Sequence, residues 1–209
     1  MTSLFSSNNQ VKYLNIIYND EVYTGNIENL FDNKEFNSLS VCTFVSSIKY
    51  FFNKVNDFDK IELLLGIEDG ENAQKFLFDP NYTSTFFSNL DKKTLTKILN
   101  NDVSIRFTST GTTIHSKIYI LKNLKTNNTR VIFGSANFST KAFGGDRQFE
   151  ELVVYDSLYN SKIVDIFLQR YEDIKKHTND FIPDIIRKKA KDIFIINLKN
   201  RGGIFLWIK

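Results

Sequence analysis

The chain of 209 residues lacks several features that would assign it to a specialised class of protein. It has a single cysteine, Cys42, so a scaffold held together by disulfide bonds is excluded. No apolar run approaches the ~20 residues that a membrane-spanning helix needs, and no secretory signal opens the chain. We therefore expect a soluble, cytoplasmic protein without a membrane partner. Cys42 lies in an apolar stretch and is expected to pack as a small hydrophobic side chain.

The chain also lacks a strong net charge. Its formal charge of +3 is too small to indicate a nucleic-acid binder by itself. The distribution is uneven, because residues 1–157 hold 16 basic and 18 acidic side chains whereas residues 158–209 hold 11 and 6. Two interpretations of this basic tail stay open: a solvated helix surface, or a surface that binds a phosphate backbone or a partner chain.

The sequence shows no cluster of Asp, Glu and His with the spacing of metal ligands. The segment EDGE at Glu68–Glu71 has the composition of an ion-binding loop. It lacks the alternating oxygen ligands and the terminal acid of an EF-hand, so a turn that leads into a helix explains it better. We predict neither a metal nor another cofactor.

Segments with strand and helix patterns alternate along the chain. Strands are expected over 11–18, 38–45, 60–67, 103–108, 113–121, 130–134 and 151–155, and helices over 26–36, 46–55, 71–78 and 92–100, after Ser139, and up to Lys176 from a cap at Ser157 or Asn160. A polar turn at Asn123–Thr129 suits a hairpin. The early order of strand, helix, strand and helix predicts an α/β fold with a mostly parallel central sheet flanked by helices. Pro183 is expected to separate a domain of residues 1–182 from a basic extension of residues 183–209.

The two histidines of the chain differ in their surroundings. His177 lies in KKHTND at the end of an expected helix and is interpreted as a surface or capping residue. His115 lies in the strand-like segment TTIHSKIYI, where alternation puts His115, Lys117 and Tyr119 on one face. By itself this face is compatible with a solvated edge or with a functional site.

Two further segments add polar groups where strands begin or end. In VIFGSANFS, Ser135 and Asn137 share a face directly after Gly134, and in QFEELVVYD, Glu150 leads into an apolar run. A glutamate at the start of a buried strand needs a partner, and the ring of His115 is suitable. A histidine, an ammonium, a carboxamide, a hydroxyl and a carboxylate together suit chemistry on a phosphate.

In this order, HSKIY, GSANFS and FEELVV resemble the signature of the phospholipase D superfamily, which is HxK, four residues, Asp, and later G-S/T-x-N. The resemblance covers approximately residues 38–176 and extends to the nuclease-like domains of restriction endonucleases and helicase-linked defence proteins. The implied fold is the phospholipase D-like α/β sandwich. Where the superfamily has Asp, five residues after the lysine, this chain has Lys122.

The resemblance implies a role for each polar residue. His115 would be the nucleophile that forms a phosphohistidine intermediate, and Glu150 would orient and polarise it. Lys117 and Asn137 would bind the phosphate oxygens, with support from Ser135. The implied function is a metal-independent phosphodiesterase that cleaves DNA as part of a restriction or phage-defence system.

A single HxK motif implies that two chains pair. In-line displacement needs a nucleophile on one side of phosphorus and a general acid on the other, so we expect a homodimer in which two copies of His115 share one active site. A helicase or a methyltransferase is a further expected partner.

A second function stays open, namely a catalytically silent DNA-binding or dimerisation module of a helicase-linked protein. Lys122 at the usual Asp position favours it, whereas the intact histidine, lysine, asparagine and glutamate favour an enzyme. Cleavage of a phosphodiester in EDTA distinguishes the two functions.

Overall fold

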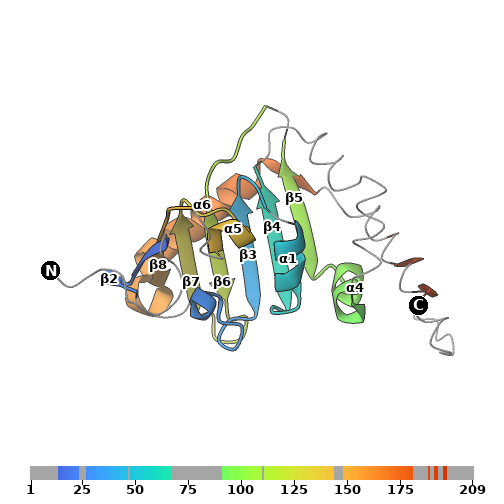
Figure 1. Cartoon of the computed structure of the whole chain (residues 1–209), viewed down its shortest axis with the longest axis horizontal. Helices are drawn as coiled ribbons and strands as arrows, with labels where there is room; N and C mark the ends of the chain where they lie inside the picture. Colours follow the sequence, from blue (N-terminus) through green and yellow to red (C-terminus); the bar gives the residue numbers. More distant parts are fainter. Residues whose placement is uncertain are drawn as a thin grey trace.

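The computed structural model describes residues 14–23, 27–46, 48–66, 91–109, 111–143 and 148–180, together with 188, 191–192 and 195–196. In these ranges the chain forms a nine-stranded sheet with the order β2-β1-β8-β7-β6-β3-β4-β5-β9 (Figure 1). No helix in the described part of the chain is long and apolar enough to cross a membrane. The helix expected over 71–78 and the boundary expected at Pro183 lie outside the described residues.

The strands are β1 (Leu14–Tyr18), β2 (Glu21–Val22), β3 (Ser38–Thr43), β4 (Lys60–Leu65), β5 (Val103–Thr108), β6 (Ile118–Lys122), β7 (Thr129–Gly134), β8 (Glu150–Asp156) and β9 (Thr178–Asp180). The helices are the 3-10 helix η1 (Ile27–Phe31) and the α-helices α1 (Ile48–Val55), α4 (Lys92–Leu99), α5 (Thr140–Phe143) and α6 (Ser157–Lys175). Most of the expected strands are therefore present, with ends displaced by a few residues.

The sheet is mostly antiparallel, so the prediction of a mostly parallel sheet is wrong. Only β3, β4 and β5 form a parallel run, and β1 pairs parallel to β8. The pairs β3–β6, β6–β7, β7–β8, β5–β9 and β1–β2 are antiparallel. One of these antiparallel pairs, β6–β7, follows directly from the turn between the two strands, which is too short for the crossover that parallel pairing requires.

That turn is closed by Asn123 and Asn127. The side chain of Asn123 accepts hydrogen bonds from the backbone of Lys125 and Thr126, and its backbone carbonyl accepts one from Asn127 at 2.8 Å. Asn127 has a φ of 62°, a left-handed conformation that asparagine tolerates better than most residues. The hairpin expected from the polar segment 123–129 is therefore confirmed, and it reverses the chain at β6.

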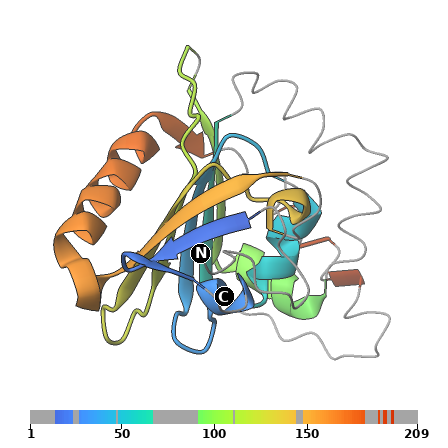
Figure 2. The same cartoon turned by 60° about the vertical axis from the view of Figure 1, so that its left-hand side comes forward.

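The helices cover the two faces of the sheet in an α/β/α arrangement (Figure 2). α6 lies on one face and packs Val164, Tyr171 and Ile174 against Cys42, Ile118 and other buried residues of the central strands. α1, α4, α5 and η1 lie on the opposite face, over the larger cluster of buried residues.

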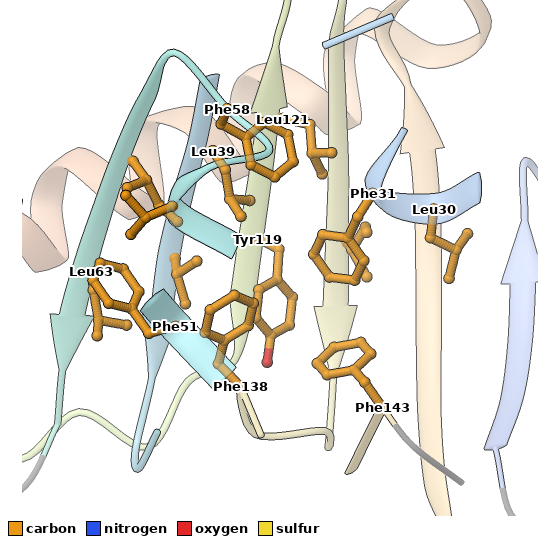
Figure 3. Packing of buried hydrophobic residues seen from close by; sticks show 14 of the residues in the cluster. Leu30, Phe31, Leu39, Phe51, Phe58, Leu63, Tyr119, Leu121, Phe138 and Phe143 are labelled. Carbon is orange, nitrogen blue, oxygen red and sulfur yellow. The ribbon is translucent and has the colours of Figure 1, made fainter. Parts of the chain in front are cut away.

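Aromatic rings fill the larger cluster next to β6 (Figure 3). The ring of Tyr119 lies 5.4 Å from that of Phe143 and 5.7 Å from that of Phe138, measured between centroids. Phe31 of η1 lies 5.1 Å from Phe143 with the rings nearly perpendicular, a favourable aromatic geometry. These contacts fix the segment that follows β7 against the sheet.

Two expected helix caps are present. Ser139 accepts a hydrogen bond from the backbone of Ala142 at the start of α5. Asn160 has non-helical φ and ψ angles inside α6, and its side chain accepts a hydrogen bond from the backbone of Ile163 at 3.1 Å. α6 thus begins at Ser157, is interrupted at Asn160 and restarts with Asn160 as its cap.

A buried arginine joins β7, β8 and η1 at one end of the sheet. Arg130 contacts both carboxylate oxygens of Asp156, at 2.7 and 2.9 Å, and donates to the carbonyls of Asn29 and Leu30. It also donates to the hydroxyl of Tyr18 at 3.0 Å. We call the end of the sheet at which Arg130 and Asp156 lie, where β7 begins and β8 ends, the clamp end.

Candidate active site

Four chain segments meet at the end of the sheet opposite the clamp end. β6 runs antiparallel to both β3 and β7, and β8 runs antiparallel to β7. The start of β6, the end of β7, the start of β8 and the end of β3 therefore lie together, where the arrowhead of β7 points in Figure 1. This end is also the carboxyl end of the parallel run of β3, β4 and β5. In open α/β sheets, ligands bind at the carboxyl ends of the parallel strands. We call this the site end.

The five residues singled out from the sequence all lie at the site end. His115 and Lys117 precede β6, Ser135 and Asn137 follow β7, and Glu150 begins β8. β6 begins at Ile118, so His115 and Lys117 lie in the segment before the strand, not inside a strand over 113–121 as expected.

The side chains of His115 and Lys117 lie next to each other. The ammonium Nζ of Lys117 lies 3.2 Å from Nδ1 and 3.4 Å from Nε2 of His115, and it donates to the His115 carbonyl at 2.8 Å. A neutral imidazole has one nitrogen that accepts a hydrogen bond. The lone pair of that nitrogen is what a nucleophilic attack requires. The imidazole itself is exposed.

The Lys117 ammonium is buried without a carboxylate as direct partner. The residue is 7% exposed, and no carboxylate of the described residues lies within ion-pair distance of Nζ. Burial lowers the pKa of Lys117, and the negative charge of Glu150 acts in the opposite direction. A buried cation in this condition gains free energy when an anion approaches it.

Glu150 is bound by Ser135. The hydroxyl of Ser135 donates to Oε2 of Glu150 and accepts from the backbone N–H of Glu151 at 2.9 Å. Glu150 is 8% exposed, and a buried carboxylate is costly without such a donor. Among the described residues no hydrogen bond joins Glu150 to His115, so the orienting role expected for Glu150 stays a prediction.

Asn137 is held through its carbonyl oxygen. Oδ1 accepts a hydrogen bond from the hydroxyl of Thr43 at 3.1 Å and faces the backbone N–H of Val45 at 3.5 Å. Thr43 is the last residue of β3 and is fully buried. Sequence reasoning missed Thr43, because a threonine at the end of an apolar strand has no distinctive signal.

Phe44 packs beside the histidine. The centroids of the Phe44 and His115 rings lie 5.0 Å apart, and Nζ of Lys117 lies 6.0 Å from the Phe44 centroid. The sequence analysis did not single out Phe44. Its aromatic ring and that of His115 come together only because β3 pairs with β6.

Close backbone contacts shape the segments around these residues. A Cβ atom on Gly134 would lie 1.9 Å from the carbonyl oxygen of Glu151, and one on Gly66 would lie 1.8 Å from that of Ile114. Both positions therefore require glycine. The buried hydroxyl of Tyr119 donates to the carbonyl of Ala136 and so fixes the segment between Gly134 and Asn137.

A comparison with known families identifies the family to which the chain belongs. The family model described as the NgoFVII restriction endonuclease N-terminal PLD domain matches residues 43–182. This chain belongs to that family. The family match begins at Thr43 and includes all five candidate site residues. PLD denotes phospholipase D, so the resemblance seen in the sequence is confirmed, and membership in the PLD family supports an enzyme that acts on phosphodiesters.

Two further comparisons were made. The search of curated proteins gave no match. Among solved structures, the chain is similar to the polyphosphate kinase from Porphyromonas gingivalis, with 9% sequence identity and a TM-score of 0.34. The similarity covers 83% of this chain and 20% of the kinase, so the chain spans about a fifth of the kinase's length.

Lys122 of this PLD-family domain lies far from the site. It is the last residue of β6 and pairs with Thr129 and Ser38 at the clamp end. The departure from the superfamily pattern at this position therefore leaves the groups at the site end in place.

His177 and Cys42 differ from the site residues in position or exposure. His177 is exposed in the turn after α6, where its carbonyl accepts from Ser109 beside β5. Cys42 is fully buried, and burial raises the pKa of its thiol to about 12, as expected of an unreactive core cysteine. The described residues contain no group of three or more His, Cys, Asp and Glu that could hold a metal ion.

Proposed function

We propose that this chain is the nuclease domain of a restriction or phage-defence system and cleaves DNA through a phosphohistidine intermediate without a metal. The observation that carries the proposal is the exposed imidazole of His115 beside the buried ammonium of Lys117, which has no carboxylate within ion-pair distance among the described residues. These two groups supply a nucleophile and a positive charge for one phosphate.

In the first step an unprotonated ring nitrogen of His115 attacks phosphorus. The N–P bond forms as the P–O bond to the leaving strand breaks, and the leaving oxygen takes a proton from a general acid. Lys117 and the NH₂ group of Asn137 stabilise the negative charge on the phosphoryl oxygens. In the second step water attacks phosphorus, the general acid's conjugate base takes a proton from that water, and the N–P bond breaks.

The general acid is assigned to His115 of a second copy. The chain has two histidines, and β3 and β4 separate β6 from β5, beside which His177 lies. Three strand spacings of about 4.8 Å each separate the two positions, too far for one phosphate. A two-fold homodimer with two copies of His115 facing one cleft supplies the missing group.

DNA as the substrate is supported by the restriction endonuclease family. Within the basic tail, residues 158–180 hold four basic and four acidic side chains, and residues 181–209 hold seven and two. We assign contacts with the DNA backbone to the basic extension of residues 183–209, which follows the catalytic domain of residues 1–182. A helicase or methyltransferase partner belongs to the same proposal.

The test compares His115→Ala with His177→Ala on a DNA fragment and on bis(p-nitrophenyl) phosphate, in EDTA. His115→Ala should lose all measurable activity, because the nucleophile and its proton chemistry disappear together, and His177→Ala should keep it. Activity of His115→Ala, or loss of wild-type activity in EDTA, would overturn the mechanism. A wild type that binds DNA and never cleaves it would support the silent module instead.

A mixed dimer tests the shared site. Wild type and His115→Ala, carrying different tags, are co-expressed and the heterodimer is purified through both tags. Because the one shared site would need both copies of His115, the activity of the heterodimer should be far below half that of the wild type. Half activity, or a fully active monomer at working concentration, contradicts the paired mechanism.

A further inference from the structure

We propose that Thr43 is a positioning residue of this site, whose hydroxyl together with the backbone N–H of Val45 fixes the orientation of the Asn137 carboxamide. The inference rests on the proposed role of Asn137 in binding a phosphate. It assigns to the end of β3 a function in the site that none of the sequence motifs indicated.

The hydroxyl of Thr43 joins two segments of the site. It accepts a hydrogen bond from the backbone N–H of Phe138 at 3.1 Å. Its proton can be donated to Oδ1 of Asn137 at 3.1 Å or to the carbonyl of Val45 at 2.9 Å, and the hydroxyl also forms a hydrogen bond with the side chain of Tyr119. Ser46 adds a second connection by donating to the carbonyl of Phe138 at 2.9 Å. The end of β3 is thereby attached to the segment that carries Asn137.

The backbone N–H of Val45 selects the oxygen of the carboxamide. It lies 3.5 Å from Oδ1 of Asn137, and an N–H can only donate. With the carboxamide turned over, its NH₂ group would face another donor, which is unfavourable. The observed orientation leaves the NH₂ group without a hydrogen-bond partner among the described residues.

This orientation matters because a phosphate diester offers only acceptors. The carboxamide can bind a phosphoryl oxygen through NH₂ and not through Oδ1. Loss of the Thr43 hydroxyl would remove one of the two donors that hold Oδ1 and would leave the N–H of Phe138 unpaired. The carboxamide would then sample orientations that cannot bind phosphate.

The experiment uses the full chain and the hydrolysis of bis(p-nitrophenyl) phosphate and a DNA fragment. Thr43→Val, which keeps the shape and removes the hydroxyl, should lower kcat/KM by about 10- to 100-fold, and Thr43→Ser should stay within about threefold of the wild type. Thr129→Val is the matched control, because Thr129 is also buried and lies at the clamp end, where its hydroxyl donates to the carbonyl of Asn127. It should leave kcat/KM unchanged.

A double-mutant cycle separates positioning from a merely structural role. In an Asn137→Ala background the further change Thr43→Val should alter kcat/KM by less than about twofold, because the group that Thr43 positions is gone. An equal loss in both backgrounds, or full activity of Thr43→Val alone, would overturn the proposal. Thr43→Ala replaces Thr43→Val in the cycle if the valine variant does not fold.

A measurement that does not depend on catalytic activity separates this inference from the proposed function. Absence of diester hydrolysis by the wild type would reject the proposed function alone. In ¹⁵N-labelled protein the side-chain NH₂ resonances of Asn137, assigned by their loss in Asn137→Ala, should shift in Thr43→Val and return in Thr43→Ser. Unchanged resonances in Thr43→Val would overturn the positioning role whatever the activity is.

Discussion

Each end of the sheet buries a cation, but the two cations differ in their partners and in the direction of their pKa shift. At the clamp end Arg130 is 6% exposed and lies in a bidentate ion pair with Asp156, with aromatic rings on two sides. Burial acts to lower its pKa, but the hydrogen bond and the negative charge of Asp156, together with smaller contributions from Tyr18 and Glu35, raise the pKa of Arg130 overall. At the site end Lys117 is 7% exposed, and burial lowers its pKa.

The two cations differ in whether their partners lie within the chain. Arg130 has its partners within the chain, so its burial serves to join β7, β8 and η1. The nearest polar groups of Lys117 are the ring and carbonyl of His115. A buried ammonium without a carboxylate partner gains more free energy from an approaching anion than a guanidinium that is already paired.

The largest effect is expected from removing each cation in turn. Lys117→Met should lower kcat by roughly 10²–10³-fold, because a charge that stabilises the transition state is lost, with little change in Tm. Arg130→Met should lower the free energy of unfolding by about 3–5 kcal/mol, because the Asp156 carboxylate keeps its burial without its partner. Diester hydrolysis and urea unfolding measure the two quantities. The comparison fails if Lys117→Met is as destabilising as Arg130→Met.

A second prediction concerns pH. Because burial lowers the pKa of Lys117 in the folded state, the unfolded chain binds more protons between that pKa and the ordinary lysine value. The contribution of Lys117 to stability therefore rises with pH across this window. Binding of an oxyanion needs the ammonium and should weaken across the same window, which lies below the ordinary pKa of lysine.

Tungstate, a phosphate analogue, tests this prediction through the rise in Tm that it produces at each pH. The rise should decline through the window in the wild type and be small at every pH in Lys117→Met. An oxyanion effect that is the same in both proteins would assign the binding to another part of the chain.

A third, smaller effect is expected from the ring beside each cation. Phe44 is half-buried against His115, and Phe36 is fully buried with Arg130 over its ring at 4.9 Å. Phe44→Leu should lower kcat up to about tenfold by loosening His115, whereas Phe36→Leu should lower Tm and leave kcat unchanged. Steady-state kinetics and thermal unfolding of both variants measure kcat and Tm. A loss of kcat in Phe36→Leu would contradict the prediction that only the ring beside Lys117 affects activity.

The smallest effect is expected at Lys122. This residue occupies the position where the superfamily has Asp, but it lies at the clamp end of β6. Lys122→Asp should change kcat/KM by less than about twofold, since a screened charge at that distance acts weakly on the site. A large gain in activity would show that the missing aspartate acts on the site.

The local structure followed largely from the sequence. The run KIELLL formed β4, VSIRFT formed β5, and the polar turn at Asn123 formed a hairpin, because strand propensity and turn chemistry act over a few residues. The candidate site residues could also be singled out, since a histidine, a lysine, an asparagine and a glutamate at strand ends are conspicuous in apolar surroundings.

The pairing of the strands could not be read in the same way. Alternation of strand and helix correctly indicated the parallel run of β3, β4 and β5, but the insertion of β6 and β7 between β3 and β8 depends on contacts across the whole sheet. Ser135 is likewise the residue that donates to Glu150, and the contact of Glu150 with His115 stays a prediction. Which polar groups meet depends on the register, and the register is a property of the assembled sheet.

The reactive groups that this protein carries can be read from its sequence, namely a histidine with a lysine two residues later, and a carboxamide and a carboxylate farther along the chain. The folded sheet brings Thr43, the last residue of β3, and Phe44, which follows it, beside these groups and puts Lys122 at the other end. It also buries Lys117 without a carboxylate partner among the described residues. This division arises because residue type fixes what a group can donate, accept or attack, whereas burial and partners arise when distant strands pair.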